Sequence, residues 1–512
     1  MRKIHGLRGP GGLPIVLIVA AVSMASACSE DSISNPPPPP PPPGGNPNAG
    51  YDVAYATFLG GNGFEEIREP ILLSGGRLLF GARTLSANMP TTGGAAQSQH
   101  GGGQGDSYLA MLSADGSRLE AATYFGGSGM ERPPYGIGIA PDGDLIFTSG
   151  TTSPDLPTTS ASYRPNLHTP VPDPGDGYVC RISGDLSSIR WCTYTGGGWP
   201  RGGLDLDSQG NPVVAGRAIG AGYTTTAGAV QGSRRGPDDA FLLKLRSDGT
   251  GAIFSTLLGG RGSDDQELAM SVRIYQADGT IVAAGNTPSA DFPTTSGSAQ
   301  PSTGGPIDAW VARFAPDGGS LVYATYIGGN DGDACEHRVY LLDDGTAVCA
   351  GSTASNDFPA GAGAPNGVRQ AYVAGVAPDG SSFRFGRLLG GSGLDHVLSP
   401  VTDSRGNIYI VGHTTSRDLD TTPDALQPSY GGGGEDGVVW ILSPDGRDVL
   451  YASYLGGSGE EMVRGIVVGP QDELYLVGRT SSSNFPVTEN ALQRVHGGDA
   501  DGFVIKLVPR QN

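Results

Sequence analysis

The sequence is poor in lysine and has no long apolar run. Only three of its 512 residues are lysine (Lys3, Lys244 and Lys506), and the apolar run at residues 13–22 is too short to span a bilayer. No phosphate-binding P-loop, no G-x-S-x-G nucleophile turn and no H-E-x-x-H zinc motif occurs. The usual signatures of nucleotide hydrolases, serine hydrolases and zinc proteases are therefore missing, and we expect a protein that is not an enzyme.

Charged residues make up only 16% of the chain, and acidic side chains outnumber basic ones by 51 to 32, which gives a net charge of −19. A surface of this sign disfavours nucleic acid as a partner and could attract cations. Glycine (85 residues) and proline (40 residues) are abundant, but 37% of the residues are hydrophobic, more than a disordered chain would contain. The composition therefore indicates a folded, turn-rich protein.

The N-terminus has the features of an export signal. Basic residues at positions 2, 3 and 8 precede the short apolar run, which ends in Ala25-Ser26-Ala27-Cys28. This ending resembles the bacterial lipobox, with Ala25 where leucine is usual, and the resemblance implies that Cys28 is lipidated. We therefore expect a lipoprotein-type signal peptide at residues 1–27. The alternative is plain secretion, because Ala-Ser-Ala is also an ordinary cleavage site.

A proline-rich segment at residues 28–50 follows the predicted cleavage site and contains eight consecutive prolines, residues 36–43. Eight residues of polyproline II extend roughly 25 Å and stay stiff. Such a spacer suits a position between a membrane anchor and a folded head. We expect a membrane-anchored, extracytoplasmic protein. An outer-membrane or cell-surface destination is favoured, because Ser29, and not the aspartate usual for inner-membrane retention, follows Cys28.

The rest of the chain is a repeat. Seven Gly-Gly pairs, each after an aromatic or apolar segment, recur at intervals of 62–70 residues. They begin at Gly60, Gly126, Gly196, Gly259, Gly328, Gly390 and Gly456. A period this regular indicates one supersecondary unit used seven times.

Each unit contains four strand signals. In the sixth unit they are residues 397–402, 408–412, 436–442 and 449–455, separated by turns such as Ser404–Asn407 and Pro444-Asp445-Gly446. Four antiparallel strands repeated in a ring describe a β-propeller. The first unit is preceded by a lone fourth strand (53–59), and the last stops at its third strand (503–507). We therefore predict an all-β, seven-bladed propeller over residues 51–512 in which the N-terminal strand closes the last blade.

Three phrases of the repeat are specific. Residues 403–412 (DSRGNIYIVG), 291–295 (DFPTT) and 501–507 (DGFVIKL), together with the Gly-Gly phrases, resemble the bacterial SBBP repeat, a family named for the seven-bladed β-propeller. The resemblance covers about residues 51–512. It implies the propeller fold and an extracytoplasmic setting, and it implies no reaction.

Four of the five cysteines form two locally spaced pairs. Cys180 and Cys192 are placed on the third and fourth strands of blade two, nearly opposite each other. Cys335 precedes the first strand of blade five and Cys349 lies on its second, so this pair is offset and needs a β-bulge to meet disulfide geometry. Behind an export signal, both pairs are disulfide candidates.

Acidic residues recur in the loops that lead from the fourth strand of one blade to the first strand of the next. They are Glu65, Glu66, Glu131, Asp264, Asp265, Asp331, Asp333, Asp395, Glu460 and Glu461. Such acids could form a rim that holds Ca²⁺ or catches a cationic partner, or they could accept backbone hydrogen bonds that join neighbouring blades. Blade three breaks the series with Trp199-Pro200-Arg201, an exposed aromatic contact or simple drift.

Our leading hypothesis is a monomeric surface lipoprotein whose propeller binds a protein or polysaccharide, with no cofactor except possible Ca²⁺. One alternative is an extracytoplasmic carbohydrate-active enzyme that uses two rim carboxylates. Another is a Ca²⁺-stabilised structural scaffold.

Overall fold

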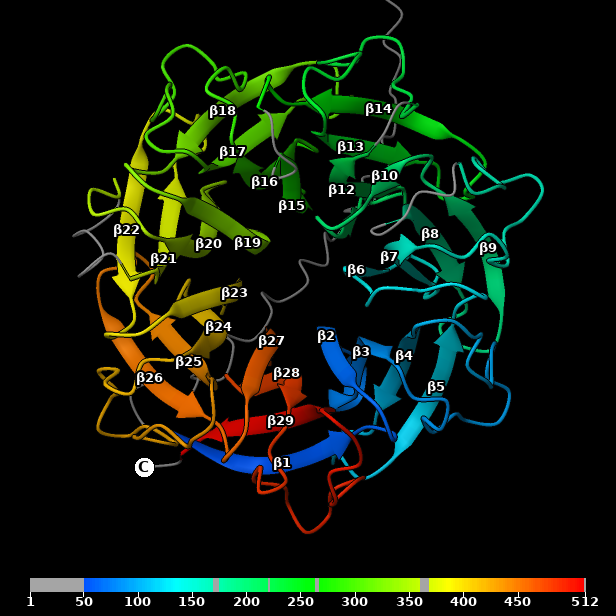
Figure 1. The fold of residues 1–512 in the computed structure, drawn as a ribbon, viewed down its shortest axis with the longest axis vertical. Helices are drawn as coiled ribbons and strands as arrows, with labels where there is room; N and C mark the ends of the chain where they lie inside the picture. Colours follow the sequence, from blue (N-terminus) through cyan, green and yellow to red (C-terminus); the bar gives the residue numbers. More distant parts are fainter. Residues whose placement is uncertain (1–49, 169–174, 220–221, 263–266, 360–367, 511–512) are drawn as a thin grey trace, which may run out of the picture. The chain divides into compact units, whose positions relative to one another are not determined.

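The computed structural model describes residues 50–168, 175–219, 222–262, 267–359 and 368–510, which form a seven-bladed β-propeller (Figure 1). Each blade is an antiparallel sheet of four strands; in blade three the innermost strand is split in two. The predicted fold class is confirmed. The predicted signal peptide, Cys28 and all but the last residue of the predicted linker lie outside the described residues.

The strands of blades one to three are β2 (Glu65–Leu72), β3 (Leu78–Thr84), β4 (Asp106–Leu112) and β5 (Leu119–Phe125); β6 (Gly136–Ile139), β7 (Leu145–Thr151), β8 (Asp176–Ile182) and β9 (Ile189–Tyr194); and β10 (Gly198–Trp199), β11 (Leu204–Leu206), β12 (Pro212–Ala218), β13 (Asp239–Leu245) and β14 (Ala252–Leu258). Those of blades four to six are β15 (Leu268–Ile274), β16 (Ile281–Thr287), β17 (Asp308–Phe314) and β18 (Leu321–Ile327); β19 (Asp333–Leu341), β20 (Ala347–Thr353), β21 (Gln370–Val376) and β22 (Phe383–Leu389); and β23 (Asp395–Thr402), β24 (Ile408–Thr414), β25 (Asp436–Leu442) and β26 (Val449–Leu455). Blade seven consists of β27 (Glu461–Val468), β28 (Leu474–Thr480), β29 (Asp501–Pro509) and β1 (Tyr51–Leu59). Within the described residues there is one short helical turn, Ser74–Gly76.

The two ends of the described chain meet in blade seven. β1 pairs antiparallel with β29, with Phe58 opposite Phe503 and Leu59 opposite Gly502 (Figure 1). The N-terminal strand thus becomes the outermost strand of the last blade, as the sequence predicts. Because β1 supplies the fourth strand of blade seven, this blade is complete like the others and β29 is not left as an exposed edge strand.

The aromatic residue of the repeated phrase fastens the long loop of its own blade. The hydroxyl of Tyr124 donates a hydrogen bond to the carbonyl of Ser86 (2.9 Å) and accepts one from the N–H of Met89 (2.7 Å). Tyr194, Tyr326 and Tyr454 donate equivalent bonds to Ser153, Ser289 and Ser416. These tyrosines are buried, so the ring fills the core while the hydroxyl is satisfied.

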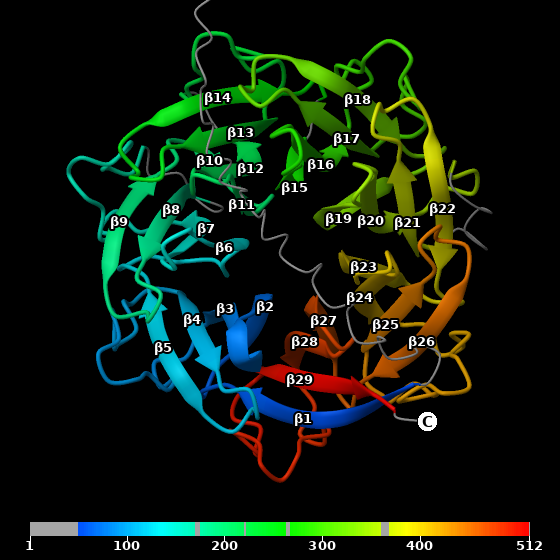
Figure 2. The same ribbon diagram turned by 180° about the vertical axis from the view of Figure 1, so that it is seen from behind.

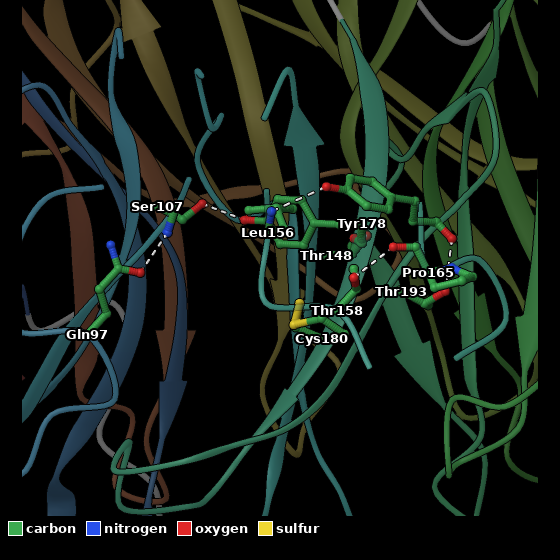
Figure 3. The surroundings of a disulfide bond; sticks show 12 residues. Gln97, Ser107, Thr148, Leu156, Thr158, Pro165, Tyr178, Cys180 and Thr193 are labelled. Atoms are coloured by element: carbon green, nitrogen blue, oxygen red, sulfur yellow. Dashed lines mark hydrogen bonds between the residues drawn. A yellow bond between two sulfur atoms is a disulfide. The ribbon is translucent and has the colours of Figure 1, made fainter. Parts of the chain in front are cut away.

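Both predicted cysteine pairs are joined as disulfides. Cys180 and Cys192 lie directly opposite each other on β8 and β9, with their Cα atoms 4.1 Å apart. Figure 3 shows Cys180 in its surroundings, where the hydroxyl of nearby Tyr178 hydrogen-bonds Ser107 of blade one (2.7 Å). Cys335 and Cys349 are bridged across a break in the β19–β20 register, so the bulge that their spacing demands is present.

Candidate functional site

Five of the predicted rim acids are buried and join neighbouring elements. Glu131 accepts hydrogen bonds from the N–H of Gly127 (2.9 Å) and from the hydroxyls of Thr151 (2.6 Å) and Ser153 (2.5 Å). Glu65, Asp333, Asp395 and Glu461 make the corresponding bonds in their blades. These acids stabilise the Gly-Gly turn from inside and do not form an exposed rim.

A second buried acid lies beside four of these five turns; at the Gly390 turn Gln370 takes its place and donates a hydrogen bond to the carbonyl of Gly391 (3.2 Å). A Cβ atom on Gly126 would lie 2.5 Å from a carboxylate oxygen of Asp106 and 2.5 Å from one of Glu131. The first glycine of the pair is therefore required by close approach. In blade three, which lacks the loop acid, Asp176 accepts the Gly197 N–H bond instead (2.8 Å).

The remaining predicted acids have three different locations. In blade four the sequence pattern favoured Asp264 and Asp265, which lie outside the described residues, and missed Glu267, which makes the turn contacts. Asp331 and Glu460 are exposed. Glu66 is the one that faces the central channel.

Bulges in the inner strands place charged side chains in this channel. Figure 2 shows the inner strands arranged around the axis. The pairing of five of them, β2, β15, β19, β23 and β27, with the next strand of the blade is interrupted by a β-bulge. A bulge re-aims side chains that regular pairing would direct elsewhere. Among the bulge residues, Glu69 of β2 pairs with Arg338 of β19 on the far side of the ring, and Arg464 of β27 pairs with Glu66.

Glu66 is surrounded by three arginines. Arg68 Nε lies 2.6 Å from one carboxylate oxygen, while Arg464 Nε and Nη2 lie 3.0 Å from the other and Arg479 Nε lies 3.6 Å from it. Burial alone would raise the pKa of Glu66, but these arginines hold it at about 2. Burial and the neighbouring Arg68 lower the pKa of Arg464 to about 10. Positive charge is therefore in excess around this carboxylate.

Next to Glu66 the channel opens into a cavity of about 240 Å³, which we call the arginine pocket. It is lined by Phe64, Glu66, Arg68, Arg83, Arg132, Pro133, Tyr135, Trp199 and Arg201. Four guanidinium groups and one carboxylate therefore line it, in a protein whose net charge is −19. Arginines gathered in one cavity of a negative molecule can attract small anions to it.

Each aromatic ring that lines the arginine pocket has a guanidinium group beside it. Arg68 lies over the ring of Tyr135 (5.7 Å), Arg201 over that of Trp199 (5.4 Å) and Arg479 over that of Phe64 (5.6 Å). Stacking fixes the plane of a guanidinium group and leaves its N–H edge available for a hydrogen-bond acceptor. In each of these three cation–π pairs, the aromatic ring therefore orients the guanidinium group of its arginine.

The break in blade three builds one wall of this pocket. Trp199 is buried (7% exposed) and packs against Gly150, where a Cβ atom would lie 2.7 Å from the indole nitrogen. Gly150 is the penultimate residue of β7, a position that holds arginine in β3 (Arg83) and β28 (Arg479). The prediction that Trp199 is an exposed contact is thus wrong: the missing side chain at Gly150 lets the indole turn inward.

Sequence reasoning missed the arginines, because they belong to no local motif. The signal that could have found them is the alignment of the repeats, since arginine recurs at the penultimate position of the second strand (Arg83, Arg217 and Arg479). Arg217 is paired with Asp238 (2.6 Å) and lies outside the pocket lining.

Two searches of the described residues gave negative results. No three His, Cys, Asp or Glu side chains in this part of the chain are grouped so that they could hold one metal ion. No helix within the same residues is both long and apolar enough to cross a membrane.

Neither a protein-family model nor a curated protein sequence matches the chain. Solved structures with a similar fold include a protein of unknown function from Dyadobacter fermentans (13% identity, 90% of this chain and 100% of that chain, TM-score 0.41) and hydrazine synthase from Kuenenia stuttgartiensis (13%, 85% and 95%, TM-score 0.42). A quinohemoprotein alcohol dehydrogenase from Pseudomonas putida is another (11%, 91% and 77%, TM-score 0.39). We take no functional argument from similarities this distant.

Proposed function

We propose that this protein is a membrane-anchored binding protein whose propeller captures an anionic ligand in the arginine pocket. The observation that carries the proposal is the concentration of four arginines and three aromatic rings around one cavity at the ring axis. Arginine and aromatic side chains are the residues that most often dominate binding energy. The repeat does not require arginine there, because the position of Arg83 is glycine in blade two (Gly150), asparagine in blade four (Asn286) and serine in blade five (Ser352).

The cellular setting of the proposal rests on the N-terminal sequence. The lipobox-like Ala25-Ser26-Ala27-Cys28, the proline-rich spacer and the resemblance to SBBP repeats all favour an extracytoplasmic head on a lipid anchor, at the outer membrane or cell surface. Two disulfides are compatible with an oxidising compartment. Capture of an anion from outside the cell is a role that such a location permits.

We do not extend the proposal to catalysis. A glycoside hydrolase needs a carboxylic acid that is protonated near neutral pH and a second carboxylate close to it. Glu66, with a pKa of about 2, has no proton to donate under such conditions.

The proposal is tested by equilibrium binding of small anions to the purified full-length protein in detergent. We expect binding of citrate or galacturonate at 50 mM NaCl that weakens at least 10-fold at 500 mM NaCl, because screening reduces the field of the pocket. The double change R83Q/R201Q should abolish it. R118Q is the matched control, because Arg118 is exposed and pairs only with Glu120. Equal binding by the double variant, or no anion binding at all, would contradict the proposal.

A further inference from the structure

The arginine pocket already contains a bound carboxylate, that of Glu66. Its two oxygens are contacted by Arg68 from its own strand and by Arg464 and Arg479 from blade seven. The contacts of Glu66 therefore show how the guanidinium groups of this pocket bind both oxygens of a carboxylate. Arg201, on the blade-three side of the same cavity, makes no ion pair within 4 Å among the described residues. Its charge interacts with that of Glu336, whose pKa is raised by burial, and among the neighbouring arginines Arg201 opposes this rise most.

Arg201 is held ready for an acceptor. Its guanidinium group lies over the indole of Trp199, and its Nε is buried without a hydrogen-bond partner in the described part of the chain. A buried N–H donor without a partner is unfavourable, and a bound acceptor would remove this penalty. The indole itself packs closely against Gly150.

The lining favours a carboxylate over a tetrahedral oxyanion. Sites for phosphate commonly use helix N-termini, glycine-rich backbone N–H groups, hydroxyls or lysine. None of the nine residues that line this pocket is glycine, serine, threonine or lysine. Arginine stacked on a ring presents a flat fork of N–H groups, which receives a carboxylate or a phosphate in two hydrogen bonds. The preference for a carboxylate therefore rests on the missing serine, threonine, lysine and glycine donors and on the example of Glu66.

On the basis of the proposed function, we infer that the ligand is a compact carboxylate and that Arg201 is the residue that selects it. A cavity of about 240 Å³ holds roughly eight waters at about 30 Å³ each, so it admits a group of about ten heavy atoms. A hexuronic acid, with about 13 heavy atoms, is slightly larger, so its carboxylate end would enter the cavity and the rest of the sugar would lie at the opening. The carboxylate can come from a free sugar acid or from one unit of an acidic polysaccharide, and the experiment below separates the two sources.

The experiment is calorimetric titration of the full-length protein in detergent with four probes: galacturonate, trigalacturonate, neutral galactose and inorganic phosphate. We expect both uronates to bind at least 10-fold more tightly than galactose or phosphate. Binding of the trimer well above that of the monomer supports the inference with a polysaccharide as the source, and equal binding supports it with a free acid.

The selecting role of Arg201 is tested by R201K, which keeps the positive charge and removes the fork. We expect at least a 10-fold loss of uronate affinity with less than a 3-fold change for phosphate, while R118K leaves both unchanged. Circular dichroism and the melting temperature verify that R201K is folded, and R201Q, which keeps two donors without the charge, serves as the second variant.

The outcomes separate the two proposals. Phosphate that binds as tightly as the uronates, or an R201K variant that weakens both alike, overturns the carboxylate inference and leaves anion capture standing. Failure of every anion to bind overturns both.

Discussion

Glu69 and Arg338 form an ion pair across the central channel although they are 269 residues apart in the sequence. Both lie in bulges, Glu69 in β2 of blade one and Arg338 in β19 of blade five, and both side chains are 14% exposed. Glu69 has a φ angle of 53°, a left-handed conformation that is unfavourable for a residue with a side chain. The pair therefore links opposite sides of the ring through a strained residue.

Removing either partner of this pair should destabilise the ring. We expect E69Q and R338Q each to lower the free energy of unfolding by about 1–3 kcal/mol, because each leaves a largely buried charge unpaired. The double variant should lose less than the sum of the two, and urea unfolding of all four proteins measures the difference. Strictly additive losses would mean that the two side chains do not interact.

The second prediction concerns Glu66. Replacing it by glutamine leaves three arginines around a neutral group, so E66Q should lower the free energy of unfolding by about 3 kcal/mol or more. Added citrate should restore part of the melting temperature of E66Q, since a bound anion would replace the lost charge. In the wild type the contribution of Glu66 is present above its unfolded pKa near 4.5 and is lost as pH falls toward about 2.

The third prediction tests the close approach at the Gly-Gly turn. G126A places a methyl group within 2.5 Å of Asp106 and Glu131, so it should destabilise the protein by about 1–3 kcal/mol. G93A is the control, because its Cβ would meet nothing within 4 Å. Thermal unfolding that ranks the two variants equally would argue against this explanation of the motif.

A pH dependence follows from the buried acids. Burial raises the pKa of Glu267 to about 7, and it raises those of Asp106, Asp333 and Asp436 to about 6. The folded state then binds these protons more tightly than the unfolded state, so their contribution is complete below about pH 4 and is lost as pH rises through 6 to 7.

We therefore expect the free energy of unfolding to fall between pH 5 and pH 8. In E267Q the fall should be smaller by on the order of 1–3 kcal/mol, because one of the titrating groups is gone. Urea unfolding at intervals of half a pH unit measures both curves. A wild-type curve that is flat over this range contradicts the prediction.

The fifth prediction concerns the anchor. If Cys28 is lipidated, C28A should move the protein from the membrane fraction to the soluble fraction, and the wild type should carry the mass of a lipid at its N-terminus. Fractionation and mass spectrometry provide the measurements. Continued membrane association of C28A would refute the lipid anchor.

Much of the architecture could be predicted from the sequence, because each blade is specified by residues close together in the chain and the same pattern recurs seven times. Strand alternation, Pro-Asp-Gly turns and the Gly-Gly phrase each involve residues close in the chain, and their period gives the number of blades. The closure by β1 followed from the lone strand at each end. The cysteine pairs followed because their spacing places them on adjacent strands.

The arginine pocket could not be predicted in the same way. Its arginines recur in some blades and not in others: Arg83 and Arg479 share a repeat position that is Gly150 in blade two. Glu66 meets Arg464 across a separation of 398 residues. Most of the acids that the sequence pattern predicted as a rim are buried and accept hydrogen bonds from the Gly-Gly turns. A polar residue that recurs at the same position in most blades is more often needed for the fold of each blade than for binding one ligand.

The scarcity of lysine and of catalytic motifs pointed away from familiar enzymes, and the repeat fixed the ring. Only the tertiary structure determines which charged side chains lie close together. Closing seven sheets around one axis brings the seven inner strands together, five of them bulged and one split, so arginines that are scattered in the chain become neighbours. That juxtaposition, with Gly150 leaving room for Trp199, makes a positive pocket in an acidic protein.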